Sequence, residues 1–164
     1  MHDPAKIDKP LIRVIDDDDA MRNSWAFLIE GEGWDVVTYS DALDFIASND
    51  FQRPGCLVLD VRMPRMSGLE LQDKMQELGI DLPIIFISGH GDIDMAVRTL
   101  KQGASDFLQK PVDDQRLLTA IGNAVMKNLN HRRTEMELSD FRKSLEQLTQ
   151  REREVIRICL LYTS

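Results

Sequence analysis

A short apolar run that stops on a single acid constrains the fold of this chain more than any other feature. Residues 56–59, with the sequence CLVL, are followed directly by Asp60, and Pro64 and Gly68 interrupt the chain before helical spacing resumes at Leu69. An uninterrupted apolar run of this length predicts a strand that is buried on both faces. Ligands of open α/β sheets lie at the carboxyl ends of the strands. Asp60 is therefore the first candidate for a functional residue.

Strand-like and helix-like segments alternate along the rest of the chain. Short apolar runs predict four further strands, at Leu11–Ile15, Asp35–Tyr39, Ile84–Ile87 and Asp106–Gln109. Segments with apolar residues at spacings of three and four separate these strands and follow the last one, which predicts helices between them. This alternation predicts an α/β fold with a doubly wound, five-stranded parallel sheet that helices cover on both faces.

The helix ends carry their own signals. Asp18 and Asp19 are expected at the start of the first helix, where the helix dipole favours acidic residues, and Ser40 is expected to be the N-cap of the second helix. Apolar residues recur at spacings of three and four from Leu138 to Leu148, which predicts a C-terminal helical extension. This stripe is too short to predict a coiled coil by itself.

The composition is typical of a soluble globular protein, with 43% hydrophobic and 29% charged residues. No apolar run is long enough for a transmembrane helix or a signal peptide, so we expect a cytoplasmic protein without a membrane partner. The spacing of Cys56 and Cys159 supports neither a disulfide nor a zinc site. Residues 1–126 contain 12 Lys and Arg against 22 Asp and Glu, so this part is unsuited to binding nucleic acid, whereas residues 127–164 contain 8 against 6.

Three carboxylates are expected to meet at one edge of the sheet. Asp16 and Asp17 follow the first strand and Asp60 ends the third, and a doubly wound topology places these two strands side by side. Neighbouring carboxylates repel one another, and a divalent cation with oxygen ligands relieves this repulsion, so the sequence predicts bound Mg²⁺. Lys110 and Ser88, at two other strand ends, supply an ammonium and a hydroxyl. Such a set could hold a phosphoryl group on Asp60.

In these residues the sequence resembles the receiver domains of bacterial two-component response regulators. The matching features are Asp16–Asp17, Asp60 in LDVRMPRMSG, Ser88 in ISGHGD and Lys110–Pro111 in FLQKP, and the resemblance covers about residues 11–126. It implies a flavodoxin-like (βα)5 fold. It also implies that Asp60 accepts a phosphoryl group from a sensor histidine kinase.

The resemblance implies roles for further residues. Mg²⁺ would be bound by Asp16, Asp17, Asp60 and the backbone carbonyl of Arg62, and Ser88 and Lys110 would contact the phosphoryl group. Phe107, three positions before Lys110, resembles the aromatic switch residue of the family. In the family, the side chains at the positions of Ser88 and Phe107 move on phosphorylation. Their movement alters the face formed by the fourth helix and the fifth strand. We therefore expect a homodimer of the phosphorylated protein.

A second resemblance begins at Leu148. The sequence LTQREREVIRI is similar to the start of a LuxR-type helix-turn-helix DNA-binding domain, and Thr149 with Glu152 forms a possible capping box. After Cys159 the sequence continues only as LLYTS, so the recognition helix is missing and we expect a truncated output domain. DNA would be bound only through that missing domain.

The predicted organisation is a receiver domain over residues 10–126, a helical linker over 127–147 and a truncated helix-turn-helix domain over 148–164. The expected function is that of a phosphorylation-controlled transcription regulator, and not that of an enzyme. An alternative is a stand-alone receiver that acts as a phosphoryl relay or sink. A phosphatase of the haloacid-dehalogenase type is disfavoured because Arg62 stands where its second acid is needed. A flavin-binding domain is disfavoured because the loop after the first strand is acidic.

Each candidate residue also has a purely structural interpretation. Asp16–Asp19 alone would be a solvated turn, and Lys110 alone would be an exposed lysine. Ser88 could simply satisfy backbone donors in its glycine-rich loop. Phe107 could be a core aromatic, a switch residue or both. His90 has no second histidine nearby and is interpreted as a loop residue.

Overall fold

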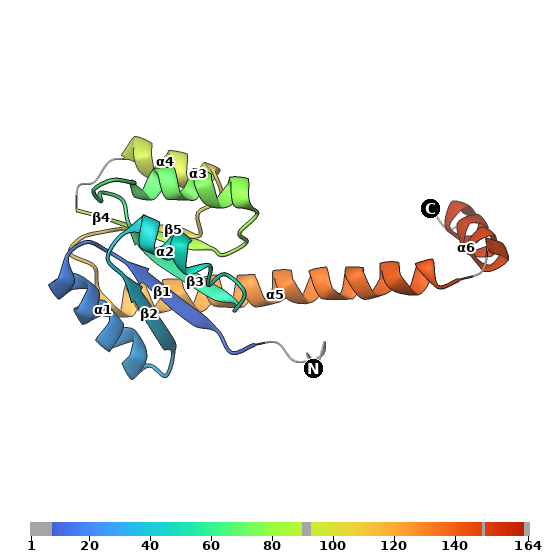
Figure 1. Ribbon diagram of the computed structural model, residues 1–164, viewed down its shortest axis with the longest axis horizontal. Coiled ribbons are helices and arrows are strands. Elements are labelled where there is room, and N and C mark those ends of the chain that lie inside the picture. The colour runs from blue at the N-terminus through green and yellow to red at the C-terminus, as the bar shows by residue number, and fades with distance from the viewer. Residues whose placement is uncertain (1–7, 90–92, 149, 163–164) are drawn as a thin grey trace. The chain divides into compact units, whose positions relative to one another are not determined.

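The computed structural model of the protein, shown in Figure 1, describes residues 8–89, 93–148 and 150–162. Its strands are β1 (Leu11–Ile15), β2 (Asp35–Tyr39), β3 (Gly55–Asp60), β4 (Ile84–Ser88) and β5 (Asp106–Gln109). Its helices are α1 (Asp19–Gly31), α2 (Ala42–Ser48), α3 (Gly68–Leu78), α4 (Ile93–Lys101), α5 (Asp114–Glu146) and α6 (Gln150–Tyr162). His90 and Thr149, for which the sequence predicted a loop position and a capping role, lie outside the described residues.

The strands form one parallel sheet in the order β2-β1-β3-β4-β5. The predicted doubly wound α/β sheet, flavodoxin-like, is therefore confirmed. The predicted neighbourhood of the first and third strands is also found, because Ile15 of β1 is in register with Leu59 of β3. This pairing places the residues that follow β1 beside the last residue of β3, at the carboxyl edge of the sheet.

Two hydrophobic cores lie on opposite faces of the sheet. Alternate strand residues such as Val58 and Leu59 contribute to different cores, since side chains of a strand alternate between its faces. One core packs the sheet against α1 and α5, and the other packs it against α2 and α3 (Figure 1). The Met95 side chain of α4 also packs against the second core. The strands β1, β3 and β4 are buried along their whole length. Burial on both faces is what the apolar run before Asp60 predicted.

The helix caps explain where the first helices begin. Asp18 is the N-cap of α1 and accepts a hydrogen bond from the backbone N–H of Met21, which confirms the predicted helix start. The prediction that Ser40 caps α2 is wrong. Asp41 is the N-cap, and its carboxylate accepts a hydrogen bond of 2.8 Å from the N–H of Asp44. Ser40 precedes the N-cap by one residue, and its hydroxyl instead donates a hydrogen bond of 3.1 Å to the Asp44 carboxylate.

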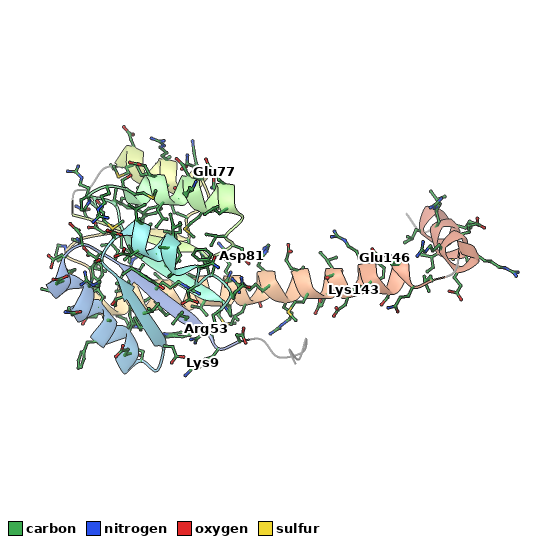
Figure 2. The ribbon with its side chains drawn as sticks, in the orientation of Figure 1. Lys9, Arg53, Glu77, Asp81, Lys143 and Glu146 are labelled. Atoms are coloured by element: carbon green, nitrogen blue, oxygen red, sulfur yellow. The ribbon has the colours of Figure 1, made fainter. Side chains whose placement is uncertain are left out.

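A charged residue in the middle of β1 is fully buried, and its side chain binds the segment that leads into β3 at the amino edge of the sheet. The Arg13 guanidinium donates hydrogen bonds to the carbonyl oxygens of Asp50, Leu11 and Arg53, at 3.0, 3.1 and 3.0 Å. At the same edge, Lys9 and Arg53, labelled in Figure 2, both bind the Asp35 carboxylate, at 3.1 and 2.8 Å. These contacts fix the loop before β3 and so the strand that carries Asp60.

The chain divides into two compact units, residues 1–129 and 130–164. The boundary falls inside α5, which is one continuous helix and contains the predicted linker up to Glu146. In the second unit, Arg153 of α6 donates a hydrogen bond of 3.0 Å to the carbonyl oxygen of Leu145. No helix among the described residues combines the length and the apolar character that crossing a membrane requires.

Candidate functional site

Three carboxylates gather where β1 and β3 end. Asp16 and Asp17 follow β1 directly, and Asp60 is the last residue of β3. One carboxylate oxygen from each of the three lies within 4.8 Å of those of the other two. Asp16 and Asp60 are buried, whereas Asp17 is exposed. The cluster is therefore open to solvent on one side and enclosed on the other.

Asp16 is the most enclosed member of this cluster. Its Oδ1 accepts a hydrogen bond of 2.9 Å from the backbone N–H of Asp18, but its buried Oδ2 has no hydrogen-bond partner within the described part of the chain. Burial, and to a lesser degree the charge of Asp60, raise the pKa of Asp16 to about 6. An ionised carboxylate with an unpaired buried oxygen is costly unless a cation compensates it.

The Asp60 carboxyl group is also buried, and it forms an ion pair with Lys110. Burial raises the pKa of its carboxyl group, while the Lys110 ammonium and the backbone N–H groups of Arg62 and Val61 act in the opposite direction. The Lys110 Nζ lies 3.8 Å from the Asp60 Oδ1. The Lys110 backbone is held in turn by a hydrogen bond of 2.8 Å from its N–H to the carbonyl oxygen of Ser88. The ends of β3, β4 and β5 are thus joined around Asp60.

The donor set suits a small divalent cation. Three carboxylates converge, one of their oxygens is buried and unpaired, and carboxylates are hard oxygen ligands of the kind that Mg²⁺ prefers. The exposed side of the cluster, at Asp17, leaves room for water or for a phosphate oxygen. The role of the Arg62 carbonyl as a ligand stays a prediction.

Ser88 and Phe107, the two residues predicted to switch, occupy neighbouring strands. Ser88 is the buried last residue of β4, directly after Ile87, which is in register with Asp60. Phe107 lies in β5, is half-buried, and packs on Phe86 with ring centroids 6.4 Å apart. Its place in the core fits the structural interpretation, and its role as a switch residue stays a prediction.

Two residues of the site were not found from the sequence. Trp25, an apolar residue of α1, has its ring centroid 5.6 Å from the Lys110 Nζ. At Gly68, a Cβ atom would lie 2.7 Å from the Asp60 carbonyl oxygen, so the start of α3 packs directly against the end of β3. The role of Trp25 has no local signal, because its contact joins segments that are far apart in the sequence. Gly68 is close to Asp60 in the sequence, but its packing depends on how the loop after β3 turns back on the strand end, where the Gly68 N–H donates a hydrogen bond of 2.9 Å to the Val61 carbonyl oxygen.

Comparisons with known proteins agree with this geometry. The family described as the response regulator receiver domain matches residues 12–122. The chain is 42% identical over 150 residues to the response regulator protein TmoT of Ectopseudomonas mendocina, covering 92% of this chain and 68% of that protein. It is 41% identical over 150 residues to the transcriptional regulatory protein FixJ of Azorhizobium caulinodans, covering 92% of this chain and 71% of that one.

Two solved structures show the same fold. The structure of the response regulator StyR matches with a TM-score of 0.86 and 38% identity, over 93% of this chain and 77% of that chain. The structure of FixJ-N matches with a TM-score of 0.68 and 39% identity, over 73% of this chain and 96% of that chain.

Proposed function

Because this chain belongs to the response regulator receiver domain family of two-component systems, we propose that Asp60 accepts a phosphoryl group from a sensor histidine kinase. One observation carries this proposal. Asp60 ends a buried strand, its carboxylate lies with those of Asp16 and Asp17, and the Lys110 ammonium is 3.8 Å away. This is an arrangement of charges that can hold a phosphoryl group on a carboxylate.

In the proposed reaction, an Asp60 carboxylate oxygen attacks phosphorus while the bond from phosphorus to the kinase histidine breaks. The product is an acyl phosphate on Asp60, and the imidazole leaves with the bonding electron pair. Lys110 places a positive charge beside the phosphoryl oxygens, and Ser88 offers a hydroxyl donor. Asp16, Asp17, Asp60 and the Arg62 carbonyl would hold Mg²⁺. The bound cation would offset negative charge on the phosphoryl oxygens.

The proposed consequence is a change at the face built from α4 and β5. Movement of Ser88 and Phe107 would alter this face and favour a homodimer. The exposed apolar side chains of α4 support an interface here, since Ile93 is 80% exposed and Val97 and Leu100 are each 45% exposed. These side chains would be covered when two copies associate.

We propose that the chain is the signalling part of a cytoplasmic transcription regulator, and not an enzyme, with DNA bound by a domain that lies beyond this sequence. Relatives named as transcription regulators support this output. A stand-alone relay or sink is the second candidate. A coding sequence that continues past Ser164 into a recognition helix would support the regulator, and a stop codon there would support the relay or sink.

The test of the proposed function is labelling with a small phosphodonor. We expect intact-mass spectrometry to detect one phosphoryl group after incubation with phosphoramidate and Mg²⁺, and much less when Mg²⁺ is chelated. Asp60→Asn should abolish the label, whereas Asp73→Asn, which changes an exposed acid on α3, should keep it. An unlabelled parent protein, or a label that persists in Asp60→Asn, would contradict the proposal.

Two further measurements separate signalling from catalysis. Hydroxylamine should remove the label, because it cleaves acyl phosphates. Continuous release of phosphate from phosphorylated small molecules, well beyond one equivalent per chain, would instead support the phosphatase alternative.

A further inference from the structure

The Lys110 ammonium lies close to both a carboxylate and an aromatic ring. Its Nζ is 3.8 Å from the Asp60 Oδ1 and 5.6 Å from the centroid of the Trp25 ring. The ring belongs to α1, whereas Lys110 follows β5 and Asp60 ends β3. Three separate segments of the chain therefore meet at this one charge.

Trp25 is held rigidly in the core. It is 6% exposed and belongs to the hydrophobic cluster that packs α1 and α5 against the sheet, together with Ile29 and Leu117. A buried ring keeps one orientation, and the negative face of an indole attracts a cation whose nitrogen lies within about 6 Å of the ring centroid. Trp25 therefore offers the ammonium a fixed partner.

Lys110 needs such a partner because its side chain is long. The hydrogen bond from its N–H to the Ser88 carbonyl fixes the backbone, but four rotatable bonds separate that backbone from the ammonium. The side chain is 25% exposed, so water competes with Asp60 for the charge. Any cation bound by the carboxylates weakens their attraction for the ammonium, whereas the attraction of the neutral ring persists.

We propose that Trp25 is a positioning residue for phosphoryl transfer, which acts by holding the Lys110 ammonium beside Asp60. This inference rests on the proposed function of Asp60. It predicts that the rate of phosphoryl transfer to Asp60 depends on the aromatic face of Trp25, although Trp25 is a core residue that acts only through Lys110.

The first test compares substitutions that keep the apolar packing but differ in the aromatic face. Trp25→Leu should lower the initial rate of labelling by phosphoramidate and Mg²⁺ about 3- to 10-fold, and Trp25→Phe should lower it less, because phenylalanine keeps a weaker cation-binding face. Trp34→Leu is the matched control, since Trp34 packs against the same core. Equal rates in the parent and in Trp25→Leu would overturn the proposal.

A double-mutant cycle separates positioning from a general effect on the core. In a Lys110→Met background, Trp25→Leu should no longer lower the labelling rate, because the charge on which the ring acts is gone. A loss of the same size in both backgrounds would overturn the proposal, since it would show that Trp25 acts independently of Lys110. Should Trp25→Leu not fold, the same cycle is carried out with Trp25→Phe.

The second test does not depend on labelling. In the metal-free protein, NMR should show the Lys110 side-chain methylene protons shifted upfield by the ring current of Trp25. The upfield shift should disappear in Trp25→Leu and be unaffected in Trp34→Leu. Lys110 resonances that do not respond to Trp25→Leu would overturn the placement of the ammonium. If the parent protein takes no label at all, the proposed function fails, and this measurement still decides whether Trp25 holds Lys110.

Discussion

Asn128 of α5 is bonded to Gly55, the first residue of β3, by a buried hydrogen bond of 2.9 Å from the Gly55 N–H to the Asn128 Oδ1. The same side chain donates a hydrogen bond of 2.9 Å to the carbonyl oxygen of Asp81, which is labelled in Figure 2. One amide therefore joins α5 to the first residue of β3 and to the segment that precedes β4. The strand that positions Asp60 is thus anchored at its first residue by α5.

We expect Asn128→Ala to lower the free energy of unfolding by about 1–3 kcal/mol, because it leaves a buried N–H without its partner. Urea denaturation measures this change. Asn123→Ala, at an exposed position of the same helix, is the control and should change stability much less. Equal stability of Asn128→Ala and the parent would show that the buried contact is not important for folding.

The stability of the metal-free protein should depend on Asp16 in a defined direction. Burial raises the pKa of Asp16 from 3.8 to about 6, so the folded state holds this proton more tightly than the unfolded chain does. The stability that protonated Asp16 contributes is fully present below about pH 4 and is lost as the pH rises through about 6. At neutral pH, the ionised group therefore opposes folding.

We expect Asp16→Asn to raise the free energy of unfolding at pH 7.5 in a chelator by on the order of 1–3 kcal/mol, and to have little effect near pH 4. Urea denaturation over a pH series measures the difference between the variant and the parent. Added Mg²⁺ should stabilise the parent more than the variant, because the cation offsets the charge that the variant lacks. A difference that does not change with pH would refute the burial of an ionisable Asp16.

Gly68 should not tolerate a side chain. A Cβ atom there would lie 2.7 Å from the Asp60 carbonyl oxygen and 3.2 Å from the Phe86 ring, so the backbone near the site would have to move. We expect Gly68→Ala to lower the free energy of unfolding by about 1–3 kcal/mol and to slow labelling of Asp60.

Gly122 provides the matched control for Gly68. It also lies within a helix, but apart from the backbone of its own helix no described atom lies within 4 Å of the position that its Cβ would take. Gly122→Ala should therefore raise the free energy of unfolding, by up to about 1 kcal/mol, because alanine favours helix formation. Thermal and urea denaturation of both variants would test this contrast, and a destabilised Gly122→Ala would contradict it.

Lys110 should couple phosphorylation to association. We expect Lys110→Ala to accept a phosphoryl group, although more slowly than the parent. The labelled variant should remain monomeric, because it lacks the ammonium that would contact the phosphoryl group and transmit its presence to the dimer face. Light scattering after gel filtration measures the mass of the labelled species. Lys74→Ala, at an exposed position of α3, is the control. If labelled Lys110→Ala formed dimers like the labelled parent, the coupling role of this lysine would be wrong.

Much of the candidate site could be predicted because each residue has a strong local signal. Asp60 follows an apolar run, and Asp16 and Asp17 stand directly after the first strand, so the parallel arrangement alone places all three at one edge. The N-cap of α2 was predicted wrongly, because Ser40 and Asp41 are adjacent and both residue types favour this position. Only the backbone geometry distinguishes them.

The amino-acid sequence by itself determined the alternation of strands and helices, the burial of β3 and the residues that end each strand. These features follow from the spacing of apolar residues and from individual acids, which are local properties of the chain. The tertiary structure alone decided that Trp25 faces Lys110, that Asn128 binds Gly55 and that Arg13 is buried within β1. Such contacts depend on how distant segments pack, and many partners of similar chemistry are compatible with the same local pattern.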